Sequence, residues 1–172
     1  PVLGYLFGVQ SAVAVAIGAY GKPGCLAALD ISEAACVLAE KNARDNGVKL
    51  TIYQEDLLSE DFWHNWPLER RYDIVTANPP YISRSELSQR DKGVREYEPL
   101  LALDGGEDGL LFYRLFAEKA ARLLRPGGTM LMEIGSSQRE DVQEIFRMAG
   151  WRVMGTRQDQ NGRDRVVEVC MG

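Results

Sequence analysis

The sequence has few of the residues from which metal sites, disulfide frameworks and membrane spans are built. It contains one histidine, His64, and three cysteines, Cys25, Cys36 and Cys170, with no C-x-x-C pair. A lone histidine without a partner at ligand spacing argues against a metal site, and scattered cysteines are typical of thiols in a reducing compartment. No apolar run is long enough to cross a bilayer. We therefore expect no metal, no disulfide and no membrane association.

Positive charge is also in short supply. The 172 residues include 20 lysines and arginines against 25 acidic residues, so the net charge is −5. Non-specific binding to nucleic acid requires clustered basic side chains that neutralise phosphates, so a nucleic-acid partner is disfavoured, although a local basic groove stays open. The free cysteines favour a cytoplasmic location, with the mitochondrial matrix as an alternative. We also expect a monomer.

The sequence does contain a regular alternation of short apolar runs and amphipathic stretches. Strands are expected at residues 1–7, 25–29, 49–54, 72–77, 129–134, 151–156 and 166–170. Helices are expected at residues 11–20, 32–46, 109–124 and 138–149. The alternation predicts one α/β domain with a Rossmann-like, mostly parallel sheet covered on both faces and an antiparallel strand at its edge. Residues 83–107 show no clear periodicity and are expected to form a lid or binding loop.

Acidic side chains follow two of the expected strands, where ligands of such sheets bind. Asp30 ends the second strand, where an acid can accept both hydroxyls of a ribose; the alternative is a cap, with Ser32, for the next helix. Asp56 follows the third strand and could accept from an adenine amino group, unless it is a solvated loop carboxylate. The two acids together favour an adenosyl cofactor.

The segment Asn78-Pro79-Pro80-Tyr81 follows the fourth strand, which the two prolines must end. The Asn78 oxygen and the Pro79 carbonyl could together accept both hydrogens of one NH2 group. Tyr81 offers a ring that could stack on a planar amide or base, and an aromatic face favours a nearby sulfonium. The alternative is a structural Asn-Pro turn. The four-residue set at a strand end favours binding of an NH2 group.

The Asn78–Tyr81 motif and its flanking segments resemble those of a known family. The Asn78–Tyr81 motif after a strand is similar to that of S-adenosylmethionine-dependent methyltransferases that modify planar NH2 groups, adenine-N6 DNA methyltransferases included. Four segments narrow the resemblance to the release-factor glutamine methyltransferase family (HemK, also called PrmC): NPPYIS, REYEPLLALDGGEDGLLFYR, MEIGSSQ and DQNGRDRVV. The resemblance runs from about Cys25 to the C-terminus.

The resemblance implies a fold, a cofactor and a substrate. It implies a seven-stranded methyltransferase fold for the catalytic domain, residues 1–172, with S-adenosylmethionine as the methyl donor. The substrate would be a peptide-chain release factor, methylated on the side-chain N5 of the glutamine in its Gly-Gly-Gln loop. Family members usually carry a helical N-terminal domain, and we expect this chain to lack it because it begins at Pro1.

Site residues follow from the same resemblance. The catalytic residues would be Asn78, Pro79 and Tyr81, and these would contact the substrate together with Pro80 and Glu98. The cofactor would be bound by Gly8, Asp30, Ile31, Asp56, Leu57 and Asn78.

The first strand departs from the family pattern, which has an acid followed by glycines. Gly4 stands where the acid is expected, and Leu6, Phe7 and Gln10 stand where glycines or small residues are expected. Only Gly8 matches plainly. Glycine is needed there because the backbone must approach the cofactor closely. Either the chain binds the cofactor weakly or not at all, or its first residues are not those of the natural protein.

Three other functions stay open from the sequence. The substrate could be a glutamine of a ribosomal protein, or an amino group of nucleic acid, at adenine N6 or guanine N2. The chain could also be a degenerate, non-catalytic relative that keeps the partner surface. The retained Asn78–Tyr81 motif speaks against the last alternative, since a scaffold has no need of it.

Overall fold

The computed structural model describes residues 2–6, 11–21, 24–89 and 103–171. The chain forms two compact units. The first unit contains Pro1–Ala77 and Ala121–Met130, and the second contains Asn78–Ala120 and Leu131–Gly172.

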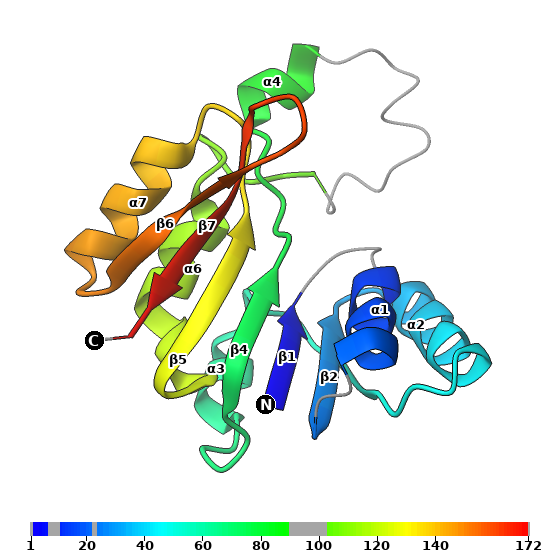
Figure 1. Ribbon diagram of the computed structural model, residues 1–172. Helices are drawn as coiled ribbons and strands as arrows, with labels where there is room; N and C mark the ends of the chain where they lie inside the picture. The colour runs from blue at the N-terminus through cyan, green and yellow to red at the C-terminus, as the bar shows by residue number, and fades with distance from the viewer. Residues whose placement is uncertain (1, 7–10, 22–23, 90–102, 172) are drawn as a thin grey trace. The chain divides into compact units, whose positions relative to one another are not determined.

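The first unit is built on parallel strands. These are β1 (Val2–Leu6), β2 (Cys25–Asp30), β3 (Thr51–Gln54), β4 (Tyr72–Ala77) and the start of β5 (Leu124–Glu133). β1 pairs in parallel with both β2 and β4, and β2 pairs in parallel with β3. The strand order is therefore β3-β2-β1-β4-β5. Figure 1 shows β2, β1, β4 and β5 side by side in this order. Residues Leu26 to Leu29 of β2 are all buried, as expected for a strand covered on both faces.

The described residues of the first unit form the helices α1 (Ser11–Gly21), α2 (Glu33–Asp45) and α3 (Glu60–Asn65). α2 begins as predicted, because the Ser32 hydroxyl oxygen accepts a hydrogen bond from the Ala35 amide at 3.3 Å. It ends at Asp45 with Asn46 as its C-cap residue, and Gly47 follows with a φ of 64°. α3 is absent from the sequence prediction, because six residues are too few to display a helical period.

The second unit contains the antiparallel part of the sheet. Its elements are α4 (Arg84–Gln89), α6 (Leu111–Lys119), the end of β5, α7 (Arg139–Met148), β6 (Arg152–Gln158) and β7 (Asp164–Cys170). β6 and β7 pair antiparallel, and the strand order is β5-β7-β6. The antiparallel pair thus ends the sheet, and the α/β prediction is confirmed.

A compact aromatic core holds α6 and α7 in the second unit. The rings of Phe146 and Trp151 meet edge to face with their centroids 5.5 Å apart, and both side chains are buried. The indole N–H of Trp151 donates to the Ala117 carbonyl of α6 at 2.9 Å. These contacts fix the helix that follows β5, and with it the segment Gly135–Gln138 that enters α7.

Three sequence predictions are corrected. β5 begins at Leu124 and not at Thr129, while the preceding helix ends at Lys119 and a 3-10 turn, Ala120–Arg122, follows. The segment after Ser83 does not start as a loop but as α4, because Ser83 and Glu86 form a capping box: Ser83 N donates to Glu86 Oε2 at 3.1 Å, and Glu86 N donates to Ser83 Oγ at 3.3 Å. Over the described part of the chain, no helix combines the length and apolar character that a bilayer span requires.

Candidate functional site

The Asn78–Tyr81 segment leaves the end of β4 with its polar acceptors unused. The side chain of Asn78 is half-buried, Pro79 and Pro80 are buried, and Tyr81 is half-buried. Within the described residues, neither the Asn78 side chain nor the Pro79 carbonyl has a hydrogen-bond partner. Two oxygen acceptors at the end of a parallel strand are thus available to a ligand. A purely structural Asn-Pro turn would be expected to use the asparagine side chain locally.

The backbone that follows is braced by the segment Leu103–Gly109. Ile82 N donates to the Leu103 carbonyl at 3.3 Å, and Gly105 N donates to the Ile82 carbonyl at 2.9 Å. A Cβ atom on Gly105 would lie 2.9 Å from Tyr81 Cα, so only glycine permits this approach. This contact explains the glycine at position 105 of the family-like stretch, because residues 103–109 pack against the motif.

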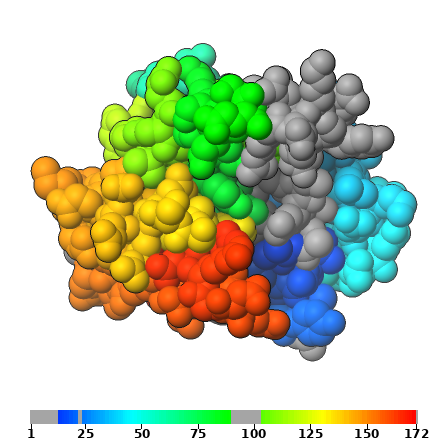
Figure 2. Space-filling model, turned by 90° about the horizontal axis from the view of Figure 1, so that it is seen from above, coloured from blue at the N-terminus to red at the C-terminus, as the bar shows by residue number. Residues whose placement is uncertain are grey.

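Gln138 fastens the same backbone from the other side, at the start of α7. Its Nε2 donates to the Tyr81 carbonyl at 3.0 Å and to the Gly109 carbonyl at 3.2 Å, while its Oε1 accepts from Gly135 N at 2.9 Å. In Figure 2 the yellow segment after β5 and the green segment after β4 lie side by side, in agreement with these bonds. The sequence prediction did not include Gln138 among the site residues, although it ends the quoted MEIGSSQ motif.

Tyr113 and Glu133 add a second set of contacts that the sequence prediction missed. The Tyr113 hydroxyl donates to the Glu133 carbonyl at 2.9 Å. Burial raises the pKa of the Tyr113 hydroxyl, and the neighbouring Tyr81 hydroxyl adds to this effect, so Tyr113 stays a protonated donor. Burial also raises the pKa of the Glu133 carboxyl, against the opposing attraction of Arg165.

Asp30 shapes the turn before α2 and keeps one carboxylate oxygen for other use. Its Oδ1 accepts from Ser32 N at 2.8 Å, while Ser32 caps the helix itself. No described residue binds the other carboxylate oxygen, so the turn-forming role leaves room for a ligand contact. Ile31 follows with 42% of its side chain exposed, an apolar surface beside the acid.

Asp56 also uses one oxygen locally. Its Oδ1 accepts from Leu58 N at 2.8 Å. The Leu57 side chain is fully buried, and its carbonyl accepts from the indole of Trp63 at 2.7 Å. The Leu57 side chain therefore belongs to the core, whereas Leu58 is half exposed. The place of Leu57 beside an adenine stays a prediction.

Two predicted site residues, Gly8 and Glu98, lie outside the described residues. The predicted cofactor residues Asp30, Ile31, Asp56 and Leu57 belong to the first unit, whereas Asn78, Pro79, Pro80 and Tyr81 belong to the second.

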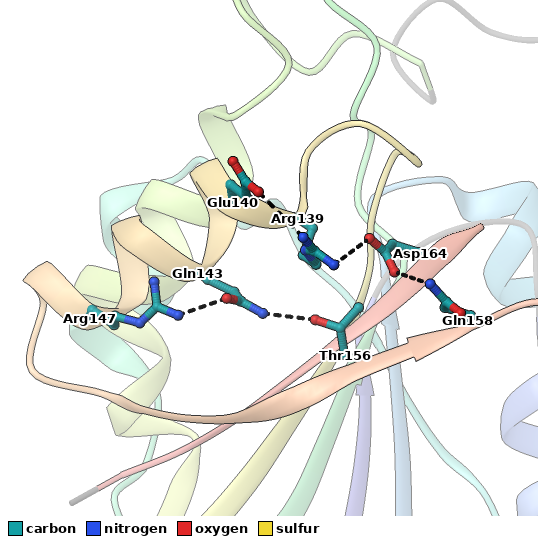
Figure 3. A pocket seen from close by; sticks show the side chains of 7 residues that line it. All are labelled: Arg139, Glu140, Gln143, Arg147, Thr156, Gln158 and Asp164. Atoms are coloured by element: carbon teal, nitrogen blue, oxygen red, sulfur yellow. Dashed lines mark hydrogen bonds and ion pairs between the residues drawn. The ribbon is translucent and has the colours of Figure 1, made fainter. Parts of the chain in front are cut away.

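A polar hollow of about 660 Å³ lies in the second unit, between α7 and the β6–β7 pair (Figure 3). Its side chains bind one another: Gln143 Nε2 donates to Thr156 Oγ1 at 2.8 Å, and Arg139 pairs with Asp164 at 3.3 Å. The lining residues are Arg139, Glu140, Gln143, Arg147, Thr156, Gln158 and Asp164. None of them is a predicted site residue, so the hollow and the candidate site share no residues.

The chain is similar to known methyltransferases in sequence. The family model described as Eco57I restriction-modification methylase matches residues 28–138. The chain is 39% identical over 161 residues to the release factor glutamine methyltransferase of Geobacter sulfurreducens, a match that covers 93% of this chain and 54% of that protein. With the enzyme of the same name from Agrobacterium fabrum it shares 41% identity over 140 residues, 80% of this chain and 46% of that protein. The chain thus spans about half the length of the curated relatives it matches.

Among solved structures, a methyltransferase from Pyrococcus furiosus superposes with a TM-score of 0.69 at 14% sequence identity, over 99% of this chain and 75% of that chain. This likeness shows the fold, and the predicted methyltransferase fold is confirmed. The resemblance drawn from the four sequence segments is confirmed by the relatives.

Proposed function

We propose that this chain, which belongs to the Eco57I restriction-modification methylase family, transfers a methyl group from S-adenosylmethionine to N5 of a glutamine in the Gly-Gly-Gln loop of a peptide-chain release factor. The observation that carries the proposal is the pair of oxygen acceptors at the end of β4. The half-buried Asn78 side chain and the Pro79 carbonyl have no partner within the described residues. Relatives at 39% and 41% identity, named for release factors, support the choice of substrate.

The two acceptors match the needs of a glutamine amide. An amide nitrogen is a poor nucleophile because its lone pair is delocalised into the carbonyl group. The oxygen of Asn78 and the carbonyl of Pro79 would each accept one N–H hydrogen and so favour a rotated, more nucleophilic nitrogen. The half-buried ring of Tyr81 would stack on the amide plane and restrict its orientation.

Methyl transfer then depends on position and charge and not on a strong base. S-adenosylmethionine, when bound, supplies an electrophilic methyl group on a sulfonium. In the proposed transfer the glutamine nitrogen would gain the methyl group, the sulfur would leave as a neutral thioether, and the nitrogen would lose one proton to water. Asn78 and Pro79 would hold the nitrogen in position, a contribution of the kind that positioning makes to enzymatic rates.

The described residues of the first unit fit an adenosyl cofactor. Asp30 keeps one carboxylate oxygen without a partner among them, Ile31 exposes an apolar side chain, and Asp56 stands after β3 with one oxygen engaged. In this proposal Asp30 accepts from the ribose hydroxyls, and Asp56 accepts from the adenine amino group.

An amino group of nucleic acid is the second candidate for the group that receives the methyl group, because the matching family model is named for a restriction-modification methylase. Glutamine, adenine and guanine all carry a planar NH2 group, so the Asn78–Tyr81 motif alone could bind any of them. The net charge of −5 favours a protein substrate over nucleic acid, whose phosphates carry negative charge.

The test is transfer of labelled methyl groups from S-adenosylmethionine. Purified release factor, ribosomal protein, DNA and RNA are offered separately, and the modified residue is identified by mass spectrometry. We expect label on the Gly-Gly-Gln glutamine of the release factor. Label on adenine or guanine alone would replace the proposed substrate, and label on a ribosomal-protein glutamine would change the partner but keep the amide chemistry. Absence of cofactor binding in calorimetric titration would support a non-catalytic relative.

A further inference from the structure

We propose that Gln138 is a positioning residue of the acceptor site: its side-chain amide sets the orientation of the Tyr81 peptide and thereby the aim of the Asn78 and Pro79 oxygens. The inference rests on the function proposed above for that motif. It extends that function to a side chain outside the motif, at the start of a different helix.

The hydrogen bonds of Gln138 fix the orientation of its amide. The Nε2 atom faces two carbonyl oxygens, those of Tyr81 at 3.0 Å and Gly109 at 3.2 Å, while Oε1 faces the N–H of Gly135 at 2.9 Å. The reverse orientation would place an oxygen against two oxygens and an NH2 group against an N–H. The side chain therefore joins three backbone segments in one way only.

Close packing leaves these segments little freedom to shift. Gly109 has a φ of +77°, and a Cβ atom there would lie 2.5 Å from the Tyr81 oxygen and 2.7 Å from Gln138 Nε2. On the opposite side a Cβ atom on Gly135 would lie 2.8 Å from Gln138 Oε1. Glycine at both positions therefore leaves room for the Gln138 side chain, which a larger residue at either position would displace.

Gln138 itself is held by the start of α7. The backbone N–H of Gln138 donates to the Gly135 carbonyl at 2.9 Å, and the backbone carbonyl of Gln138 accepts from Val142 N at 3.0 Å. Val142 is fully buried in the core of the second unit. The position of the Tyr81 carbonyl is therefore fixed by the start of α7 as well as by its own loop.

The consequence for the reaction follows from the short distance along the chain. The carbonyl that Gln138 holds belongs to the fourth residue of the motif, and Pro79 and Pro80 between it and Asn78 restrict the backbone. A rotation of the Tyr81 peptide is therefore passed to the Asn78 and Pro79 oxygens. A displacement on the order of 1 Å at a reacting group can reduce a rate by about 100-fold.

Two substitutions test the role in the full chain. Gln138→Leu keeps most of the volume and removes all three hydrogen bonds, whereas Gln138→Glu keeps the acceptor for Gly135 N and sets an oxygen against the two carbonyls. The matched controls are Gln143→Leu and Gln143→Glu. Gln143 lies on the same helix, is half-buried, and binds Thr156 Oγ1 at 2.8 Å.

Two readouts separate positioning from general stability. The first is amide hydrogen exchange at Ile82 and Gly105, which reports the braced backbone without any reaction. The second is the steady-state rate of methylation of the release factor, resolved into kcat and KM. For Gln138→Leu we expect exchange at these two amides to rise about tenfold and kcat to fall about 10- to 100-fold, with KM for the release factor nearly unchanged.

The controls should leave both readouts near wild type. Equal exchange and equal kcat in the Gln138 and Gln143 variants would overturn the inference, as would a Gln138 variant that loses thermal stability but keeps kcat. If the exchange difference is present while the wild-type chain methylates no release factor, the proposed function fails and the positioning of Tyr81 by Gln138 stands.

Discussion

The side-chain amide of Gln138 donates to the carbonyl oxygen of Tyr81 across 3.0 Å, although 57 residues separate them in the chain. The bond ties the segment after β5 to the segment after β4. Both segments follow strands of a fold whose ligands bind at strand ends. The substrate site that we propose at Asn78 and Pro79 would in this way be supported from outside its own loop.

Removal of the Asn78 side chain should abolish most of the activity without a loss of stability. For Asn78→Ala we expect kcat for release-factor methylation to fall about 100- to 1,000-fold, because one of two preorganised contacts to the nitrogen is lost. The melting temperature should stay near wild type, since no described residue uses this side chain as a hydrogen-bond partner. An active Asn78→Ala variant would remove the asparagine from the mechanism.

A methyl group at Gly109 should displace the Tyr81 backbone. Gly109→Ala combines a φ of +77° with a Cβ atom 2.5 Å from the Tyr81 oxygen, so we expect a loss of about 1–3 kcal/mol in unfolding free energy from the backbone conformation alone, together with reduced methylation. Gly150→Ala is the control, because Gly150 has a φ of +84° and a Cβ atom there would meet nothing within 4 Å. Denaturant unfolding and kcat are measured on both. If the two variants lost activity equally, the contact with Tyr81 would not matter.

Neutralising Asp30 should weaken cofactor binding and spare the fold. Asp30→Asn keeps Oδ1 as the acceptor for Ser32 N and replaces the second oxygen, which no described residue binds, by an NH2 group. We expect the dissociation constant for S-adenosylmethionine to rise about 10- to 100-fold in calorimetric titration, as for the loss of a charged hydrogen bond. Asp45→Asn, at an exposed ion pair with Lys41, should leave the constant unchanged. An unchanged constant for Asp30→Asn would leave the acid with its turn-forming role alone.

Glu133 should make the protein less stable at neutral pH. Burial raises the pKa of its carboxyl, with Arg165 opposing, so the folded state favours the protonated form. The stability that this form provides is complete below the ordinary carboxyl pKa of about 4.3 and is lost as the pH rises through the raised pKa. Glu133→Gln should therefore raise the melting temperature at about pH 7, with a difference that shrinks toward about pH 4. A lower melting temperature for the variant at neutral pH would show that attraction to Arg165 outweighs burial.

Local patterns predicted most strands and the start of one helix. β4 spans Tyr72–Ala77 as predicted, because an apolar run meets two prolines that cannot continue it. The Ser32 cap of α2 and the Gly47 stop likewise follow from side-chain chemistry within a few residues. Asn78 and Asp30 were identified as candidates because strand ends in such sheets carry ligand groups.

Features that depend on distant contacts were missed. The role of Gln138 depends on a partner 57 residues away, which no local pattern reports. The full burial of the Leu57 side chain also depends on contacts that no local pattern reports, and its predicted place beside the adenine stays a prediction. Helix α4 was missed for another reason: the capping box of Ser83 and Glu86 is a local sequence signal, and the prediction did not use it.

The most direct test of the proposed function is mass spectrometry of a release factor incubated with the 172-residue chain and S-adenosylmethionine. We expect one added methyl group on the side-chain nitrogen of the Gly-Gly-Gln glutamine with wild-type protein, and none with Asn78→Ala. A release factor left unmodified by wild-type protein that binds the cofactor, or modified equally by the Asn78→Ala variant, would contradict the proposed function.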